Sequence, residues 1–344
     1  MTITRPAAIH TSPARNTAAI SLLDETHDET QDETLAEARE EITTGLSAPR
    51  PFVSPKYLYD PLGSRLFEAI TDLPEYYPTR TERSIFARHV KDMAHAAGTG
   101  ATFIDLGAGN CEKARSLFDA FRPKQYVAID ISAEFLDGAL EALRRQFPDM
   151  DMVGLGMDFS AGLDLPATVG TTQRLFFYPG SSIGNFSPLS ALALLTDIRR
   201  HCSVSNAGGT GGGLLIGFDL VKDPVVLEAA YDDSLGVTAA FNLNLLNHLN
   251  TLIDSNFKVR DWQHRATFNT RLSRIEMHLE AKHDVTVAWP GGERKFREGE
   301  SIHTENSYKY TLPDIRGILL QAGFRDVRTW TDDAQWFAVC HASV

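Results

Sequence analysis

The strongest constraint on the fold is a glycine turn between two short apolar runs. Residues 103–110 read FIDLGAGN, so an apolar run ends in Gly107 and Gly109, and a second run at 126–129 ends in Asp130. With the helix-like stretch between them, these runs predict one βαβ unit with an acid at the tip of its second strand. The glycines let the backbone turn sharply and approach a ligand, because no Cβ intervenes. Asp130 is placed to accept hydrogen bonds from the hydroxyls of a ribose. The sequence therefore predicts a parallel sheet that binds a nucleotide or a nucleoside.

The turn lacks the third glycine of a dinucleotide site. In the pattern G-x-G-x-x-G that glycine belongs to the cradle of a pyrophosphate, and Glu112 stands in its place here. The loop is therefore more typical of a nucleoside site, as in methyltransferases that use S-adenosylmethionine, than of a nicotinamide-dependent dehydrogenase. The turn alone is also compatible with an ordinary βα connection, or with a module that binds a nucleoside without turnover.

The composition favours a globular protein of a reducing compartment. The 344 residues allow one large domain or two moderate ones, and 43% apolar and 23% charged residues are ordinary for a soluble chain. No apolar run is long enough to span a bilayer, and residues 1–21 lack the hydrophobic centre of a signal peptide. Cys111, Cys202 and Cys340 form no C-x-x-C pair, and the 11 histidines form no H-E-x-x-H pattern. We therefore expect a cytoplasmic protein and no metal site.

The formal charge of −12 is concentrated near the amino terminus. Nine acids and one base, Arg39, lie between residues 24 and 41, so this stretch carries −8 and leaves about −4 for the rest. The nearly balanced remainder has no basic stripe for a phosphate backbone, which disfavours nucleic-acid binding. We expect a small-molecule substrate, no membrane association and a monomeric protein.

Strand-like and helical stretches alternate after residue 100. The strand-like runs are residues 102–106, 126–129, 152–154, 174–178 and 213–219, and helical stretches at 132–147 and 189–201 separate several of them. This alternation is typical of an α/β fold, a doubly wound and mostly parallel sheet with helices on both faces.

The rhythm changes after residue 219, which indicates an insertion. A helical region at 224–253 precedes alternating runs at 274–281 and 286–289, and a helix at 312–322 then resumes the earlier alternation. We expect four parts: a flexible acidic tail (1–34), an amino-terminal segment that packs with the insertion (35–80), the sheet domain (81–219 and 311–344) and an inserted α+β domain (220–310).

Several longer motifs resemble one known family. Those motifs are YLYDPLGSRLFE at 57–68, LPEYYPTR at 73–80, the turn around Asp105, YPGSSIGNF at 178–186, AYDD at 230–233 and TENSYKY at 304–310. In this order they resemble the histidine-specific methyltransferases, from about residue 48 to the carboxyl end. The resemblance implies a Rossmann-like class I methyltransferase sheet with an inserted domain, and S-adenosyl-L-methionine as the cofactor. It also implies trimethylation of the α-amino group of L-histidine to hercynine, the first step of ergothioneine biosynthesis.

The resemblance assigns five residues to the cofactor. Gly107 resembles the cofactor turn and Asp130 the acid that binds the ribose. Lys113 resembles the residue that pairs with the cofactor's carboxylate, and Asp158 and Phe159 resemble the pair that contacts the adenine. Two plainer interpretations stay open, since Lys113 is also compatible with a solvated helix charge and Phe159 with a core residue.

The resemblance also assigns the binding of the substrate's amino-acid end. Asn185 and Tyr231 would bind the α-carboxylate, to which both side chains can donate hydrogen bonds without adding charge. Gly180 would lie close to the α-amine, and Tyr59 and Tyr76 near the amine and the imidazole. An α-ammonium must lose a proton before it attacks a methyl group, and Tyr59 is the candidate to receive or relay that proton.

The side-chain pocket is assigned to three further residues. Glu305 and Ser307 would hold the imidazole, and Met277 would pack beside it. Residues two apart on a strand point to the same side, so an acid and a hydroxyl can meet the two ring nitrogens of one imidazole. This favours histidine over tryptophan, since an indole has a single N–H, but a relative acting on tryptophan or another amino acid stays the alternative. Individually, Tyr76 could be a core aromatic, Asn185 a structural cap, and Glu305 a surface ion-pair partner of Lys309.

Overall fold

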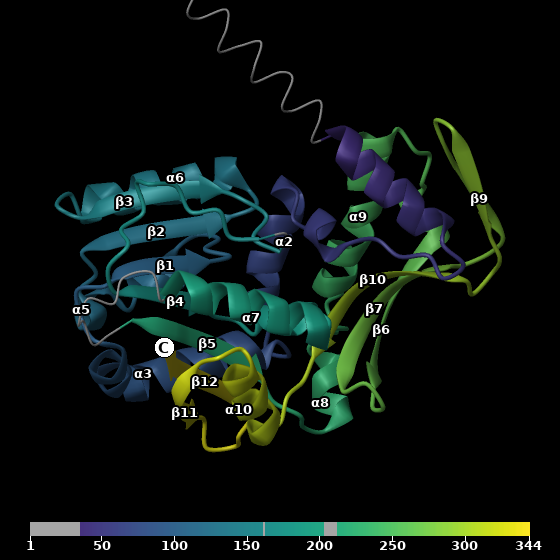
Figure 1. Cartoon of the computed structure of the whole chain (residues 1–344). Coiled ribbons are helices and arrows are strands. Elements are labelled where there is room, and N and C mark those ends of the chain that lie inside the picture. Colours follow the sequence, from purple (N-terminus) through teal and green to yellow (C-terminus); the bar gives the residue numbers. More distant parts are fainter. Residues whose placement is uncertain (1–34, 161, 203–211) are drawn as a thin grey trace, which may run out of the picture.

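Seven strands form one central sheet in the computed structural model, which describes residues 35–160, 162–202 and 212–344 (Figure 1). The strands are β1 (Thr102–Leu106), β2 (Gln125–Asp130), β3 (Asp151–Gly156), β4 (Arg174–Tyr178), β5 (Gly213–Asp219), β11 (Arg325–Thr331) and β12 (Phe337–Ser343). Their order across the sheet is β11-β12-β5-β4-β1-β2-β3. The pairs among β1 to β5 are parallel, whereas β12 runs antiparallel to both β5 and β11. The expected α/β sheet is thus confirmed, while the expected tail at 1–34 lies outside the described residues.

The strand order creates a ligand site at one edge of the sheet. β1 pairs with β2 on one side and with β4 on the other, so the chain changes its direction of winding between β1 and β4. Ligands of doubly wound sheets bind outside the carboxyl ends of the strands at such a switch point. Gly107 follows β1, Asp130 ends β2 and Gly180 follows β4, so these three predicted site residues share this edge.

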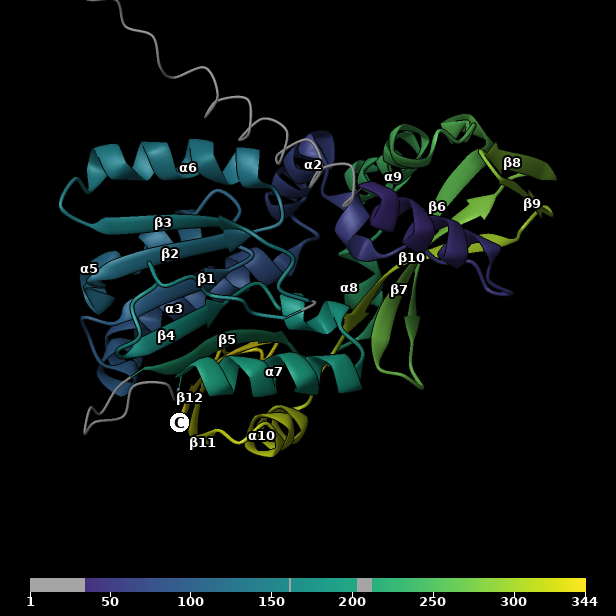
Figure 2. The ribbon, with the colours of Figure 1, turned by 45° about the horizontal axis from the view of Figure 1, so that its top comes forward.

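Helices cover both faces of the sheet. They are α3 (Tyr77–Ala97), α4 (Glu112–Arg115), α5 (Phe118–Phe121), α6 (Ala133–Gln146), α7 (Pro188–Cys202) and α10 (Leu312–Gln321). Side chains of α3, α5 and α6 pack with Phe103 and Tyr126 on one face, and those of α7 and α10 pack with Ile104 and Val127 on the other. Because successive side chains of a strand point to opposite faces, these continuous apolar runs are buried on both sides. Figure 2 shows α6 along one side of the sheet and α7 along the other.

The segment between β5 and α10 builds two antiparallel sheets of its own. Its elements are α8 (Pro224–Ala229), α9 (Val237–Ile253), the 3₁₀ turn η3 (Val259–Asp261), β6 (Trp262–Asn269), β7 (Arg274–Ala281), β8 (Val285–Trp289), β9 (Gly292–Phe296) and β10 (Ser301–Tyr308). The strands β10, β7 and β6 form a three-stranded sheet, and β8 and β9 form a hairpin. These elements lie beside the carboxyl edge of the central sheet, at the right of Figure 1.

The amino-terminal segment packs onto this insertion. It contains a helix at 35–47, the 3₁₀ turn η1 (Pro55–Leu58) and α2 (Pro61–Thr71). One apolar core joins buried residues between 42 and 77 to buried residues between 227 and 302. Arg39 also donates from Nε to the carbonyl of Leu252 at 2.8 Å. We therefore propose that residues 35–80 and 220–310 form one folding unit, with the boundaries that the sequence predicts.

Several elements differ from the expectations. The stretch after the glycine turn is two short helices, α4 and α5, rather than one. The helical region at 224–253 is likewise divided into α8 and α9, because Gly236 adopts a left-handed φ of 75° where α9 begins. The long helix α3 and the strand β6 were not expected. α3 mixes few apolar residues with many charges, so its periodicity is weak.

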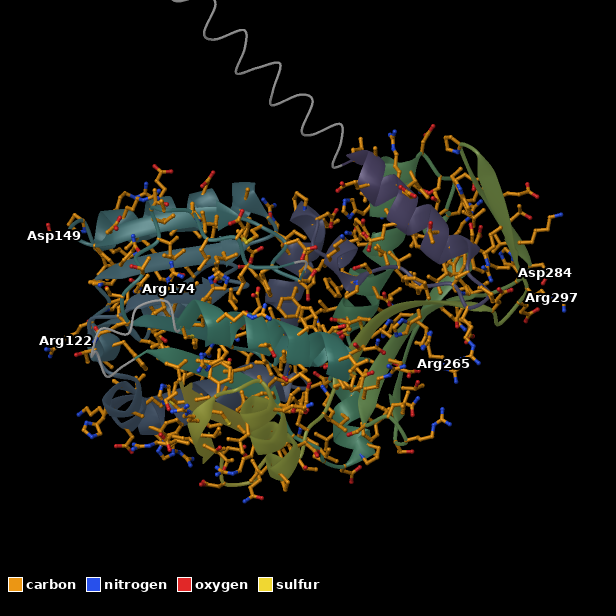
Figure 3. The ribbon with its side chains drawn as sticks, viewed as in Figure 1. Arg122, Asp149, Arg174, Arg265, Asp284 and Arg297 are labelled. Carbon is orange, nitrogen blue, oxygen red and sulfur yellow. The ribbon has the colours of Figure 1, made fainter. Side chains whose placement is uncertain are left out.

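Exposed charges of both signs occupy the two ends of the molecule. Arg122 and Asp149 lie at the end of the sheet remote from the insertion, and Arg265, Asp284 and Arg297 lie on the outer side of the insertion (Figure 3). These charges are therefore solvated.

Candidate active site

The glycine turn after β1 is held by the acid that ends β2. Asp130 accepts hydrogen bonds from the backbone N–H of Gly109 at 2.9 Å and of Ser132 at 3.0 Å. Gly107 and Gly109 have φ of 70° and 52°, and a Cβ on either would meet no atom within 4 Å. The turn therefore borders open space on its ligand side. Ile131 directly follows Asp130 and is 42% exposed, so it adds an apolar side chain next to this acid. It was not among the predicted site residues.

A buried carboxylate joins this turn to the loop after β4. Glu82 of α3 is only 1% exposed, and it accepts from Lys113 Nζ at 2.8 Å and from the backbone N–H of Gly180 at 2.7 Å. Gly180 has φ of 75°, and a Cβ there would lie 3.1 Å from Lys113 Nζ. A predicted cofactor residue and a predicted substrate residue are therefore in contact through one acid. Glu82 was not predicted from the sequence. The one sign of it is its position three and four residues before Ile85 and Phe86, which places an acid on the buried face of α3.

The two residues assigned to the adenine lie past the end of β3. Asp158 accepts from the backbone N–H of Ser160 at 3.0 Å, and Lys56 Nζ lies 3.6 Å from its carboxylate. The ring of Phe159 meets Tyr178 edge to face, with centroids 5.7 Å apart. Both residues thus stand at the carboxyl edge of the sheet, and Phe159 also packs against the core below it.

All eight residues assigned to the substrate line one cavity. Its empty space, which is open to solvent at the mouth, amounts to about 470 Å³. Its walls come from the amino-terminal segment, from the loop after β4 and from the insertion. The eight residues are Tyr59, Tyr76, Gly180, Asn185, Tyr231, Met277, Glu305 and Ser307. The structure thus brings together side chains from parts of the chain that lie far apart in sequence.

Local turn chemistry explains how Tyr59 reaches the cavity. Asp60 accepts from the backbone N–H of Gly63 at 2.7 Å and so caps α2, whose first residue is Pro61. A Cβ at Gly63 would lie 1.8 Å from the carbonyl oxygen of Leu58, so only glycine fits there. This tight turn fixes the backbone of Tyr59, which directly precedes Asp60.

Three tyrosines form an aromatic wall that keeps its protons. Tyr76 and Tyr231 meet edge to face with ring centroids 6.2 Å apart, and Tyr59 packs on Phe241 at 5.6 Å. Burial raises the pKa of each of these phenols, and the nearby Glu305 and neighbouring phenols add to the effect on Tyr59. At neutral pH the wall therefore presents O–H groups, not phenolates.

Tyr231 is fixed from behind by a histidine of β6. His264 lies within hydrogen-bond distance of the Tyr231 carbonyl at its Nε2, 2.8 Å, and of Asn242 Nδ2 at its Nδ1, 2.9 Å. A carbonyl only accepts, so Nε2 carries the proton and Nδ1 accepts from the amide. Burial lowers the pKa of His264, which agrees with a neutral ring. Sequence reasoning missed this residue, because β6 was not expected.

Glu305 and Ser307 face the cavity from β10. The register of β10 against β7 shifts between His303 and Glu305, and both Glu305 and Ser307 are buried, at 7% and 4% exposed. Burial raises the pKa of Glu305 to about 7, against the charge of Lys309 and a hydrogen bond from Asn185. The alternative of a surface ion pair between Glu305 and Lys309 is wrong, since both are buried and Lys309 Nζ pairs with Asp219 at 2.8 Å.

The fold and the site together define a class of protein. A glycine turn and a ribose-type acid stand at the switch point of a sheet whose β12 is antiparallel, and beside them lies a cavity lined by tyrosines, Asn185, Glu305 and Ser307. This is the arrangement of a small-molecule methyltransferase with a class I sheet. Within the described ranges, we find no helix that could cross a bilayer, and no group of three or more His, Cys, Asp or Glu residues suited to a metal ion.

Comparison with known proteins leads to the particular family. The sequence profile described as "Histidine-specific methyltransferase, SAM-dependent" matches residues 38–344. The histidine N-alpha-methyltransferases of Mycolicibacterium smegmatis and Mycobacterium tuberculosis are 37% and 36% identical, over 88% and 89% of this chain and 94% of each relative. The ergothioneine biosynthesis protein 1 of Schizosaccharomyces pombe is 29% identical over 78% of this chain and 36% of its own length. The chain therefore belongs to the histidine-specific methyltransferase family, and it is an S-adenosylmethionine-dependent N-methyltransferase.

Proposed function

We propose that this enzyme transfers three methyl groups from S-adenosylmethionine to the α-amino nitrogen of L-histidine, giving hercynine for ergothioneine biosynthesis. The observation that carries the proposal is that Glu305 and Ser307 both line the cavity. An imidazole has two ring nitrogens, and the acid and the hydroxyl offer it two polar partners within one buried wall. The identity with histidine N-alpha-methyltransferases over most of the chain supports the same substrate.

The residues at the carboxyl edge of the sheet fit the cofactor. The open space beside Gly107 and Gly109 has room for a ligand backbone, and the carboxylate of Asp130 has lone pairs left for ribose hydroxyls. The side chain of Lys113 is 42% exposed, so its ammonium can bind the cofactor's carboxylate on the solvent side while it keeps its ion pair with the buried Glu82. When bound, S-adenosylmethionine supplies an electrophilic methyl group.

The cavity residues position the amino acid for attack. In the proposed pose, Asn185 and Tyr231 donate to the α-carboxylate and Glu305 and Ser307 hold the ring, with Met277 packed against it. The α-nitrogen then lies near Gly180, whose N–H is fixed by Glu82 at 2.7 Å. Holding both ends of the substrate orients the nitrogen for attack, and such positioning lowers the barrier of the reaction.

Tyr59 is proposed to relay the proton that leaves the α-ammonium. Because burial raises its pKa, Tyr59 keeps its own phenolic proton at neutral pH and cannot also retain the proton that leaves the substrate. Its oxygen can accept a hydrogen bond from the ammonium while its own O–H donates onward to water. The final acceptor is therefore solvent, and the tyrosine fixes the path.

The walls around the nitrogen suit a trimethylated product. Glu305 is the sole acid among the described residues that line the cavity, and it is assigned to the ring. The tertiary and quaternary products thus meet the faces of Tyr59, Tyr76 and Phe241 in place of a salt bridge, and aromatic faces attract a quaternary ammonium.

Product analysis tests the proposal. Purified protein is incubated with S-adenosylmethionine and, in separate reactions, with histidine and tryptophan. We expect histidine to gain three methyl groups by mass and tryptophan to gain none. Methylation of tryptophan or another amino acid, with histidine unchanged, would overturn the substrate assignment and leave the methyltransferase class intact. A product with fewer than three methyl groups at completion would overturn trimethylation alone.

A further inference from the structure

A fully buried lysine lies directly behind the cavity wall. The side chain of Lys309 has no exposed surface, and its ammonium lies 2.8 Å from Asp219, 2.8 Å from Ser307 Oγ and 3.1 Å from the Tyr231 hydroxyl. An ammonium has three protons and accepts nothing, so these three acceptors satisfy it completely. Two of the three acceptors belong to side chains that line the cavity.

The cluster around Lys309 carries a net positive charge. Among the described residues, Asp219 is the one carboxylate that pairs directly with Lys309, and Lys222 Nζ lies 2.5 Å from its other oxygen. Glu305 and Asp332 act on Lys309 and Lys222, respectively, at longer range. Burial alone would raise the pKa of Asp219, but Lys309 and Lys222 lower it below its ordinary value. Tyr77 also donates to this carboxylate, at 2.7 Å, and stays neutral because burial raises its pKa. Among the groups in direct contact, one carboxylate thus faces two ammonium groups, which leaves an excess of one positive charge within these contacts.

The same lysine fixes the direction of the hydroxyl hydrogen bonds. The oxygens of Tyr231 and Ser307 are 2.7 Å apart, so one hydroxyl donates to the other. Because Lys309 only donates, both oxygens must accept from it. The two hydroxyls have two protons in total, and one of these forms the hydrogen bond between the two oxygens. A single O–H is left to donate into the cavity.

We propose that Lys309 is a positioning residue that directs this one O–H, from Tyr231, towards the α-carboxylate of the substrate and supplies the positive charge behind it. The inference rests on the proposed function and deepens it. Ser307 then donates to Tyr231 and accepts from Lys309, so its remaining lone pair faces the cavity. It can only accept there, and the ring nitrogen next to Ser307 must therefore carry a proton. The carboxylate and the ring of the substrate are coupled through the two hydroxyls.

Three variants separate the charge from the hydroxyl contacts. Lys222→Met removes one positive charge from the cluster but leaves both hydroxyl contacts of Lys309. The double variant Lys309→Met/Asp219→Asn keeps the net charge of the wild type but removes those contacts. Lys309→Met removes both. The assay is run below pH 8, because burial lowers the pKa of Lys222 to about 8 and its charge is lost above that value.

The readouts are steady-state kinetics with histidine and calorimetric binding of histidine and histamine, which lacks the carboxylate. We expect Lys309→Met to raise the KM for histidine by roughly 30-fold or more, with a smaller change in kcat, and Lys222→Met and the double variant each to raise it by roughly 3- to 10-fold. The loss for Lys309→Met should shrink for histamine. Binding of S-adenosylmethionine should stay within about 3-fold of the wild type in all three variants.

Two results would overturn the inference. The first is a histidine affinity of Lys309→Met within about 3-fold of the wild type. If Lys309→Met does not fold, the same criterion applies to the double variant, in which both substituted positions are uncharged. The other is an equal loss for histidine and histamine, which indicates a merely structural lysine. Wild-type turnover of histidine is judged separately, so failure of the proposed function remains distinguishable. In that case the variants are compared on the amino acid that the wild type does methylate.

Discussion

Replacing Glu305 by glutamine should stabilise the free enzyme and weaken it as a catalyst. The carboxyl has an ordinary pKa of 4.5 and a pKa of about 7 in the folded protein, because it is buried. The folded state therefore binds the proton more tightly than the unfolded chain, and the free energy of unfolding falls as the pH rises from 4.5 to 7. Above that window the ionised acid costs about 3 kcal/mol. Glutamine keeps the shape and removes this cost.

The loss of function follows from the same carboxylate. A hydrogen bond from a ring N–H to a charged acceptor is worth about 1.5 to 3 kcal/mol, so Glu305→Gln should raise the KM for histidine by roughly 10- to 100-fold. Cofactor binding should be unchanged, because Glu305 lies on the insertion and the glycine turn on the sheet.

Chemical denaturation at several pH values and steady-state kinetics check both effects. The expected gain in stability is largest near pH 8 and vanishes near pH 5, as the pKa of about 7 requires. Glu280→Gln on β7 is the matched control, since hydrogen bonds from Gln263 and Arg265 lower the pKa of that acid and its loss should give no gain. A Glu305→Gln protein that is less stable than the wild type at pH 8, or that keeps the wild-type KM, would refute the reasoning.

Three further substitutions probe the rest of the site. Asp130→Asn should weaken S-adenosylmethionine binding about 10-fold by calorimetry without changing histidine binding to the same extent, and equal losses would contradict its assignment to the cofactor. Gly180→Ala should lower the melting temperature and kcat, since φ is 75° and the new Cβ lies 3.1 Å from Lys113 Nζ, whereas Gly138→Ala on α6, with nothing within 4 Å, should be neutral or stabilising. Tyr59→Phe should lower kcat roughly 10- to 100-fold with little change in the histidine KM, and an unchanged kcat would remove the proposed relay.

The central sheet was predictable because its signals are local. Five apolar runs bounded by turn residues became β1 to β5, and the bounds of β1, β4 and β5 match the expected residues. Gly107, Gly109 and Asp130 follow from the same short segment, since the βαβ unit needs a tight turn and an acid at its strand tip. The insertion was visible as a change of rhythm. β6 within it and α3 before the sheet were not predicted, because their apolar patterns are weaker.

The candidate site was predictable only in part. The motifs gave eight of the residues that line the cavity, through resemblance and not through periodicity. Glu82 was missed because its partners, Lys113 and Gly180, are separated from it by 31 and 98 residues along the chain. His264 was missed because β6 was not expected, and its partner, the carbonyl of Tyr231, is 33 residues away.

The sequence by itself determined the strands, the glycine turn and the acid at the end of β2, because these depend on residues that are neighbours along the chain. Only the tertiary structure decided which charges are buried together. Asp219 meets Lys309, which lies 90 positions further along the chain, and Tyr77, which lies 142 positions before it. Desolvation and charge pairing set the protonation of Glu305 and the direction of the hydroxyl hydrogen bonds, and both arise when the insertion closes over the edge of the sheet.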